Sequence, residues 1–275
     1  MTRDSKGNIY FSEQRMRRIY KWDVEKEQLT LIADLPWQPL SLACDTKDNL
    51  LVFFKYNPQP GYLVDGKQEA VVELPDAVGT TFSHWGNSGF ATWVYSINPE
   101  QPEETIQLLD KVPMGSVSHV AKAIYPAHRW RDLHDFDKIS VWKPEYCLVA
   151  PDGLTIIPEY YDFARSSSVL EAIPGKVLYT SDEYNHLLAR MDVKADGTLE
   201  NLTHFVNVGE FGSTVDGRGN VYVADGYIYV FDKQGKQIDL IRVPERPTSL
   251  VVGGKDSNTL YIAARSSLYR YTIHH

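Results

Sequence analysis

The sequence has few cysteines, no long apolar segment and no long run of basic residues. Only two of its 275 residues are cysteines, Cys44 and Cys147, and neither lies in a CxxC or Cys/His spacing. We therefore expect two buried free thiols rather than a disulfide framework or a structural zinc site. No stretch approaches the roughly 18 consecutive apolar residues of a membrane-spanning helix. The formal net charge of −8 makes the chain a poor candidate to bind nucleic acid or an anionic membrane.

Motifs of several enzyme classes are also missing. The chain has no GxSxG nucleophile motif and no glycine loop for phosphates or dinucleotides. Its first residues, MTRDSKGN, do not form a signal peptide, and the compartment stays open because a secreted protein without its leader would look the same. Hydrophobic residues make up 43% and charged residues 23% of the chain, which predicts a folded domain with a substantial core.

The strongest positive signal is a repeat. Each unit has an apolar strand, a turn rich in Asp, Gly and Asn, an aromatic-rich strand, a strand that ends in Asp and a β-branched outer strand. The turn asparagines Asn8 and Asn49 are 41 positions apart, and Asn220 and Asn258 are 38 apart. Four strands in every 40 to 45 residues, roughly, predict an all-β fold of the β-propeller type.

The number of turns predicts six blades. Second-strand turns occur near residues 8, 49, 88, 175, 220 and 258, and the gap between the third and the fourth is about twice the period. Residues 101–140 lack the strand–turn–strand pattern, whereas 145–161 supply a third and a fourth strand. We therefore expect a six-bladed propeller with blade 3 enlarged by a long insertion at about 101–142. A hidden seventh blade is the alternative.

The two ends of the chain do not complete the ring. The first repeat has no innermost strand before Asp4, and the last stops after three strands at Ile273. Propellers usually close by pairing an N-terminal strand into the last blade, because an open edge invites aggregation. Residues 1–275 are therefore expected to be a single propeller domain from a longer chain, whose other domains are possible partners.

Two C-terminal stretches resemble a known family. VDGRGNVYVADGYIYVFDKQGK and PERPTSLVVGGKDSNTLYIAARSSLYRY are similar to repeats of the senescence-marker-protein, gluconolactonase and luciferin-regenerating-enzyme family. The resemblance implies a six-bladed propeller that holds one divalent cation, often calcium, at the mouth of its central channel. It also implies hydrolysis of sugar lactones, in which an acidic residue and metal-bound water attack the ring carbonyl.

The family's metal ligands are not matched in this sequence. The family's Asn before the fourth blade aligns with Ser167, and its Asp before the fifth blade aligns with Phe211, whose neighbour Glu210 is the only carboxylate nearby. The family's Asn–Asp pair before blade 3 falls at Thr81 and Phe82. A hard cation needs several oxygen ligands, carboxylates included. We therefore assign no metal ligand and expect the family site to be absent or rebuilt.

The expected insertion contains the most unusual cluster of side chains. YPAHRWRDLHDFD, at 125–137, includes His128, Arg129, Trp130 and Arg131. Arginine binds carboxylates with a planar fork of donors, and tryptophan stacks against sugar faces. A long loop on a propeller face is a natural wall for the channel mouth. The alternative is a solvated loop held by its own Arg–Asp pairs.

Other candidate binding residues precede expected innermost strands, where the functional side chains of propellers converge. They are His84, Trp85, Arg165 and Ser167, together with Glu210 as the candidate acid/base. For His84 and Trp85 the alternative is to fill a blade interface. We further expect residues 125–137 to fold over the mouth, so that their arginines line a pocket with Glu210.

Two functions remain open at this point. The first is a hydrolase of the lactonase type, with Glu210 as acid/base and the insertion's arginines holding a carboxylate of the substrate. The second is a non-catalytic propeller that binds a carbohydrate or a partner domain after losing the metal. The missing carboxylates favour the second, and the family resemblance favours the first.

Overall fold

All the secondary structure that the structure describes is β. The computed structural model describes residues 1–35, 39–44, 47–56, 63–64, 67–68, 91–113, 120–122, 145–149, 156–160, 166–173, 176–182, 185–194 and 199–274. These residues form 24 strands and contain no helix, which confirms the expected all-β class. Nor do they include a helix that could cross a membrane.

The strands form six sheets of three or four strands in chain order. The first sheet has β1 (Thr2–Arg3), β2 (Ile9–Glu13), β3 (Arg18–Asp23) and β4 (Gln28–Asp34). The second has β5 (Pro39–Cys44), β6 (Leu50–Tyr56), β9 (Ala91–Asn98) and β10 (Gln101–Pro113), and the third has β11 (Val120–Lys122), β12 (Glu145–Val149) and β13 (Ile156–Tyr160). β7 (Leu63–Val64) and β8 (Lys67–Gln68) form a separate pair.

The C-terminal half repeats the same arrangement. The fourth sheet has β14 (Ser166–Ile173), β15 (Val177–Asp182), β16 (Leu187–Val193) and β17 (Leu199–Val206). The fifth has β18 (Ser213–Val215), β19 (Val221–Asp225), β20 (Tyr227–Phe231) and β21 (Gln237–Ile241), and the sixth has β22 (Pro247–Gly253), β23 (Thr259–Ala264) and β24 (Ser267–Thr272). Neighbouring strands in these three sheets are all antiparallel.

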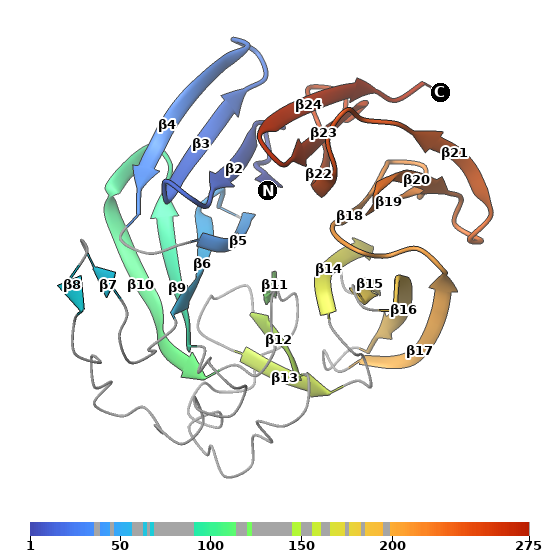
Figure 1. The fold of residues 1–275 in the computed structure, drawn as a ribbon, viewed down its shortest axis with the longest axis horizontal. Coiled ribbons are helices and arrows are strands. Elements are labelled where there is room, and N and C mark those ends of the chain that lie inside the picture. Colours follow the sequence, from blue (N-terminus) through green and yellow to red (C-terminus); the bar gives the residue numbers. More distant parts are fainter. Residues whose placement is uncertain are drawn as a thin grey trace.

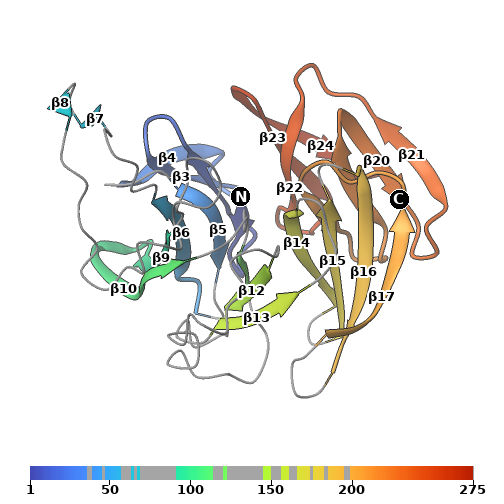
Figure 2. The ribbon, with the colours of Figure 1, turned by 60° about the horizontal axis from the view of Figure 1, so that its bottom comes forward.

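The sheets are arranged around a common centre (Figure 1). β5, β11, β14, β18 and β22 lie nearest the middle, and β4, β10, β17 and β21 lie on the rim. Figure 2 shows the fourth sheet from another side, with its strands next to one another in chain order. Among the described strands, β11 and β12 pair in parallel, and the other neighbours in these sheets are antiparallel. Such a radial arrangement of mainly antiparallel sheets is that of a β-propeller.

The apolar core lies between adjacent sheets. One cluster joins the first and second sheets and includes Tyr10, Ile19 and Leu50. Corresponding clusters join the fourth sheet to the fifth and the fifth to the sixth. β19 is buried along Val221–Ala224 because a neighbouring sheet covers each of its faces, whereas the rim strand β4 is mostly exposed. In the repeats whose burial the structure describes, the aromatic-rich second strand is therefore a core strand.

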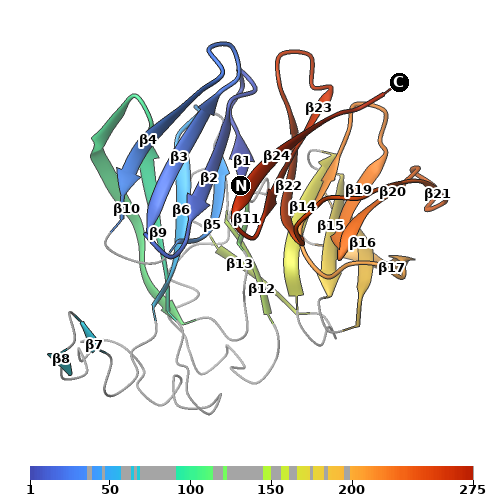
Figure 3. The ribbon, with the colours of Figure 1, turned by 45° about the horizontal axis from the view of Figure 1, so that its top comes forward.

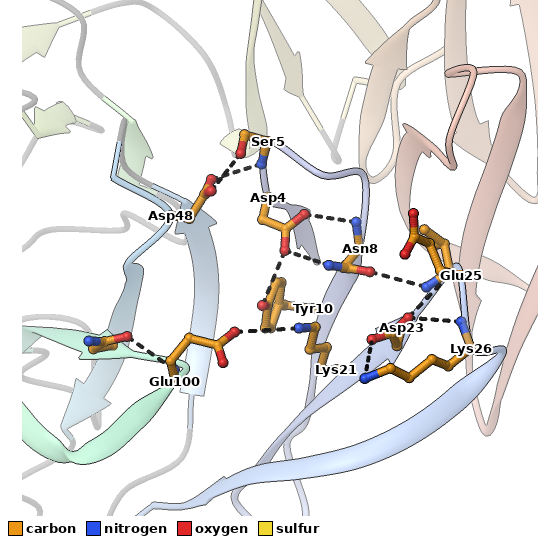
Figure 4. A network of polar contacts seen from close by, with 12 residues as sticks. Asp4, Ser5, Asn8, Tyr10, Lys21, Asp23, Glu25, Lys26, Asp48 and Glu100 are labelled. Atoms are coloured by element: carbon orange, nitrogen blue, oxygen red, sulfur yellow. Dashed lines mark hydrogen bonds and ion pairs between the residues drawn. The ribbon is translucent and has the colours of Figure 1, made fainter.

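The repeated turn motif has a structural role. The Asp4 carboxylate accepts hydrogen bonds from the backbone and side-chain amides of Asn8, both at 2.8 Å, and from the Tyr10 hydroxyl at 3.3 Å (Figure 4). In the same way, the Asp216 carboxylate accepts hydrogen bonds from the backbone and side-chain amides of Asn220, at 2.9 and 2.8 Å, and from the Tyr222 hydroxyl at 3.2 Å. We call this arrangement the Asp–Asn–Tyr clamp. It fixes the turn between the first two strands of a sheet.

One position in this turn needs a left-handed backbone. Gly7 has a φ of 83° and Gly219 a φ of 85°, and Asp48 and Ser257 occupy the same position in the second and sixth sheets with φ values of 63° and 50°. Glycine adopts this conformation without steric cost. The glycine of the D-x-x-G-N motif therefore marks the left-handed position of the turn in the sequence.

The N-terminal half differs from the sequence-based expectation. Residues 101–113, expected to begin the insertion, form β10, which pairs with β9 and closes the second sheet. Residues 91–98, expected to follow a second-strand turn of blade 3, form the third strand of the second sheet. The turn that joins them contains Asn98, whose side-chain oxygen accepts the Glu100 N–H at 3.0 Å. This turn joins the third and fourth strands of its sheet, whereas the predicted number of blades rests on turns that join the first two strands.

The first and sixth sheets meet without a shared strand among the described residues. Figure 3 shows β1 and β2 facing β22 and β24. The Gly254 N–H donates to the Gly7 carbonyl at 3.3 Å, and the Arg3 guanidinium donates to the Ser257 hydroxyl at 3.0 Å. The first sheet does have an innermost strand, because β1 pairs with β2 over two residues. The sixth sheet has three strands, as expected.

Candidate functional site

Glu210 lies in the connection between β17 and β18, at the start of an innermost strand. Its side chain is buried, and both carboxylate oxygens accept hydrogen bonds from Arg246 in the next equivalent connection, between β21 and β22. The Nε–Oε2 distance is 3.1 Å. The Arg246 guanidinium also lies over the Phe211 ring, 5.7 Å from its centre, and the Arg246 side chain remains 46% exposed. A buried carboxylate thus holds a partly exposed positive charge.

Close backbone packing fixes the Glu210 loop. A Cβ on Gly209 would lie 2.1 Å from the Leu187 carbonyl oxygen, so only glycine fits there. The Phe211 N–H donates to the Ala224 carbonyl at 3.0 Å, and the Phe211 carbonyl accepts the Ser181 hydroxyl at 2.8 Å. These contacts join the loop to the fourth and fifth sheets and place the Glu210 carboxylate.

A histidine–aspartate pair lies beside this loop. His186 Nδ1 lies 3.1 and 3.0 Å from the two carboxylate oxygens of Asp225. Asp225 also accepts the Gly209 N–H at 3.0 Å, which ties the pair to the Glu210 loop. The His186 side chain is 52% exposed, and that of Asp225 is 16% exposed. Sequence analysis did not select either residue, because His186 lies in an ordinary strand-connecting turn.

The charges of the cluster act on the imidazole. The hydrogen bond and the negative charge of Asp225 raise the pKa of His186, and Glu210 adds to this effect, whereas partial desolvation and the Arg246 charge oppose it. His186, Asp225, Glu210 and Arg246 therefore share one electrostatic environment. We call these four residues the mouth cluster.

The mouth cluster belongs to one end of the sheets. Glu210 and Arg246 immediately precede β18 and β22, while the Asp216 and Gly254 turns follow the opposite ends of these strands. A separate pocket of about 360 Å³ lies at that opposite end, lined by the turns around Asp4, Asp48 and Gly254. The mouth cluster is thus a separate polar site rather than part of this pocket.

Most of the candidate binding residues lie outside the described residues. This applies to His84, Trp85, His128, Arg129, Trp130, Arg131 and Arg165, and to the side chain of Ser167, whose backbone belongs to β14. The expected pocket between residues 125–137 and Glu210 therefore stays a prediction. Of the candidate side chains, the structure describes Glu210 and gives it a partner, Arg246, that sequence reasoning missed.

The described residues do not fit the divalent cation that the family implies. Both Glu210 oxygens already accept from Arg246, and the neighbouring Phe211 has no side-chain oxygen. In the described part of the chain, no three His, Cys, Asp or Glu side chains gather in a way that could hold a metal ion. A guanidinium against the only carboxylate of the loop would repel a second cation.

Solved structures with the same fold identify the class of protein. A gluconolactonase from Xanthomonas campestris superposes with a TM-score of 0.59 and 15% identity, over 98% of this chain and 83% of that chain. The calcium-binding protein regucalcin from Agrobacterium tumefaciens gives 0.52 and 15%, over 96% and 81%. The Cps50 (Swd1) β-propeller domain from Myceliophteria thermophila gives 0.53 and 12%, over 99% and 98%. The chain has the β-propeller fold.

Part of the sequence also matches a family model. Residues 174–266 match the family model of the SMP-30/Gluconolactonase/LRE-like region, which confirms the family resemblance over about a third of the chain. No curated protein sequence matches the chain. The matched stretch includes every residue of the mouth cluster.

Proposed function

We propose that the chain is a six-bladed propeller that hydrolyses a sugar-derived lactone at the mouth cluster. The six sheets of three or four strands support the blade number. The observation that carries the proposed activity is that the stretch matching the lactonase-related family also supplies the four polar side chains of the mouth cluster, which lie at one end of the sheets.

In this proposal, Arg246 stabilises the reacting oxygen. Attack on a lactone carbonyl develops negative charge on its oxygen, and a preorganised positive charge lowers the barrier of such a step. Glu210 orients Arg246 through both of its carboxylate oxygens. An acid/base role for Glu210 is less favoured by this geometry, because an oxygen that already accepts from a guanidinium is poorly placed to exchange protons.

An assay of glucono-δ-lactone hydrolysis tests this function. The release of acid is measured over time and compared with the rate of spontaneous hydrolysis. We expect catalysis above background that persists in EDTA, and a loss of about 10²-fold in kcat in Arg246→Lys, which keeps the charge but not the planar fork. Arg242→Lys, an exposed substitution four positions earlier, is the matched control. A wild-type rate equal to background, with and without Ca²⁺, Mn²⁺ or Zn²⁺, would exclude the lactonase.

Binding without catalysis is the second candidate function. The engagement of Glu210 by Arg246 favours it, since the only carboxylate beside the family's ligand position is already paired. In that case, calorimetry with gluconate would show saturable binding that weakens in Arg246→Lys, while no lactone is consumed.

A further inference from the structure

The pair His186–Asp225 has the geometry of an oriented base. Asp225 engages Nδ1 with both oxygens, at 3.1 and 3.0 Å, and is itself fixed by the Gly209 N–H. When Nδ1 carries the proton that Asp225 accepts, Nε2 of the neutral ring has a lone pair. About half of the His186 side chain is exposed, so a water molecule can reach the ring. A carboxylate that fixes the tautomer and orientation of an imidazole is a recurring device in hydrolysis.

The position of the pair links it to the reaction. Gly209, which donates to Asp225, directly precedes Glu210, and the Glu210 and Arg246 charges both act on His186. His186 lies in the turn between β15 and β16, and Arg246 lies in the connection between β21 and β22. The candidate base and the positive charge therefore come from different sheets and act within one cluster of charges. Glu210 and Arg246, together with Asp225, are the charged groups of the described structure that act on the imidazole.

We propose that His186, oriented by Asp225, is the general base that deprotonates the water attacking the lactone, an assignment that rests on the proposed function. Nε2 takes a proton from water as the water oxygen bonds to the carbonyl carbon. The tetrahedral adduct then breaks the bond from carbon to the ring oxygen, and the leaving oxygen takes the proton back from Nε2. The product is the open hydroxy acid, and the imidazole returns to its neutral form.

The variants His186→Gln and Asp225→Asn test this assignment. Removal of a general base costs about 10²- to 10⁴-fold, so we expect kcat of His186→Gln to fall by at least about 10²-fold with little change in KM. His204→Gln, at an exposed histidine on β17 of the same sheet, is the matched control and should keep the wild-type rate. Thermal unfolding of all three variants shows whether each one is folded.

The pH profile separates a positioning role of Asp225 from a structural one. Asp225 raises the pKa of His186, so Asp225→Asn should shift the acidic limb of kcat/KM to lower pH as well as reduce the rate. Wild-type catalysis retained in His186→Gln with an unchanged pH profile would overturn this assignment and leave the proposed function standing. A wild-type protein without catalysis would overturn both.

Discussion

At the residue scale, His186 should make stability depend on pH. Its pKa is raised in the folded protein, first by the Asp225 hydrogen bond and charge, so folding favours the protonated ring. The stabilisation is therefore fully present below the ordinary pKa of 6.5 and is lost as the pH rises through the raised value. We expect NMR titration to place the His186 pKa above 6.5 and to find it lowered in Asp225→Asn. A wild-type value at or below 6.5 would contradict the pairing.

The Asp–Asn–Tyr clamp gives a second prediction at this scale. Asp216→Ala would leave the half-buried amide of Asn220 and the buried hydroxyl of Tyr222 without their acceptor, so we expect a loss of about 3 kcal/mol in the free energy of unfolding. Asp232 accepts two backbone N–H bonds in an exposed turn, and Asp232→Ala should cost about 1 kcal/mol or less. Denaturant unfolding of the two variants measures the difference, and equal losses would show that the clamp is not specially stabilising.

The site residues show what the sequence could reveal. Glu210 could be found because it lies beside a position that the family resemblance marks. Arg246 is 36 positions from Glu210, and Asp225 is 39 positions from His186. Each separation is close to the repeat period, because equivalent loops of neighbouring sheets lie side by side. A search for complementary charges one period apart would have found both pairs.

At the scale of elements, the turn motif was predicted and the boundaries of the second sheet were not. D-x-x-G-N encodes a backbone conformation locally, and it recurs in the structure with the same hydrogen bonds. The pairing of β6 with β9 brings together strands separated by more than thirty residues, and no local pattern encodes it. We therefore assigned 91–98 and 101–113 to the next blade and its insertion.

The loop from β17 to β18 gives a prediction about elements. A Cβ on Gly209 would meet the Leu187 backbone at 2.1 Å, whereas a Cβ on Gly217 would meet nothing within 4 Å. Gly209→Ala should therefore cost about 3 kcal/mol and displace Glu210, because backbone must move. Gly217→Ala should change stability by less than about 1 kcal/mol. Unfolding curves compare the two, and similar values would show that the loop yields without cost.

At the scale of the whole molecule, substitutions at two matched glycines can measure how much the contact of the first and sixth sheets contributes to stability. Gly7 and Gly219 occupy the same turn position with φ values of 83° and 85°. A Cβ on Gly7 would lie 2.7 Å from the Gly254 carbonyl oxygen, and one on Gly219 would lie 3.9 Å from Lys233. In both variants, the positive φ costs alanine about 1 kcal/mol. In Gly7→Ala, we expect the free energy of unfolding to fall by about 2 kcal/mol more, because the new Cβ meets the Gly254 carbonyl. Equal losses would mean that this contact contributes nothing.

The contact between the first and sixth sheets also affects where the folded molecule opens locally. The described bonds between the first and sixth sheets come from turns and long side chains, and the ion pair of Glu27 with Arg270 is more than half exposed on both sides. Exposed ion pairs contribute little and weaken with salt, whereas the fourth, fifth and sixth sheets are joined through buried apolar clusters. Local opening should therefore start at the contact between the first and sixth sheets, with amide protons of β1 exchanging sooner than those of β19, and sooner still at high salt.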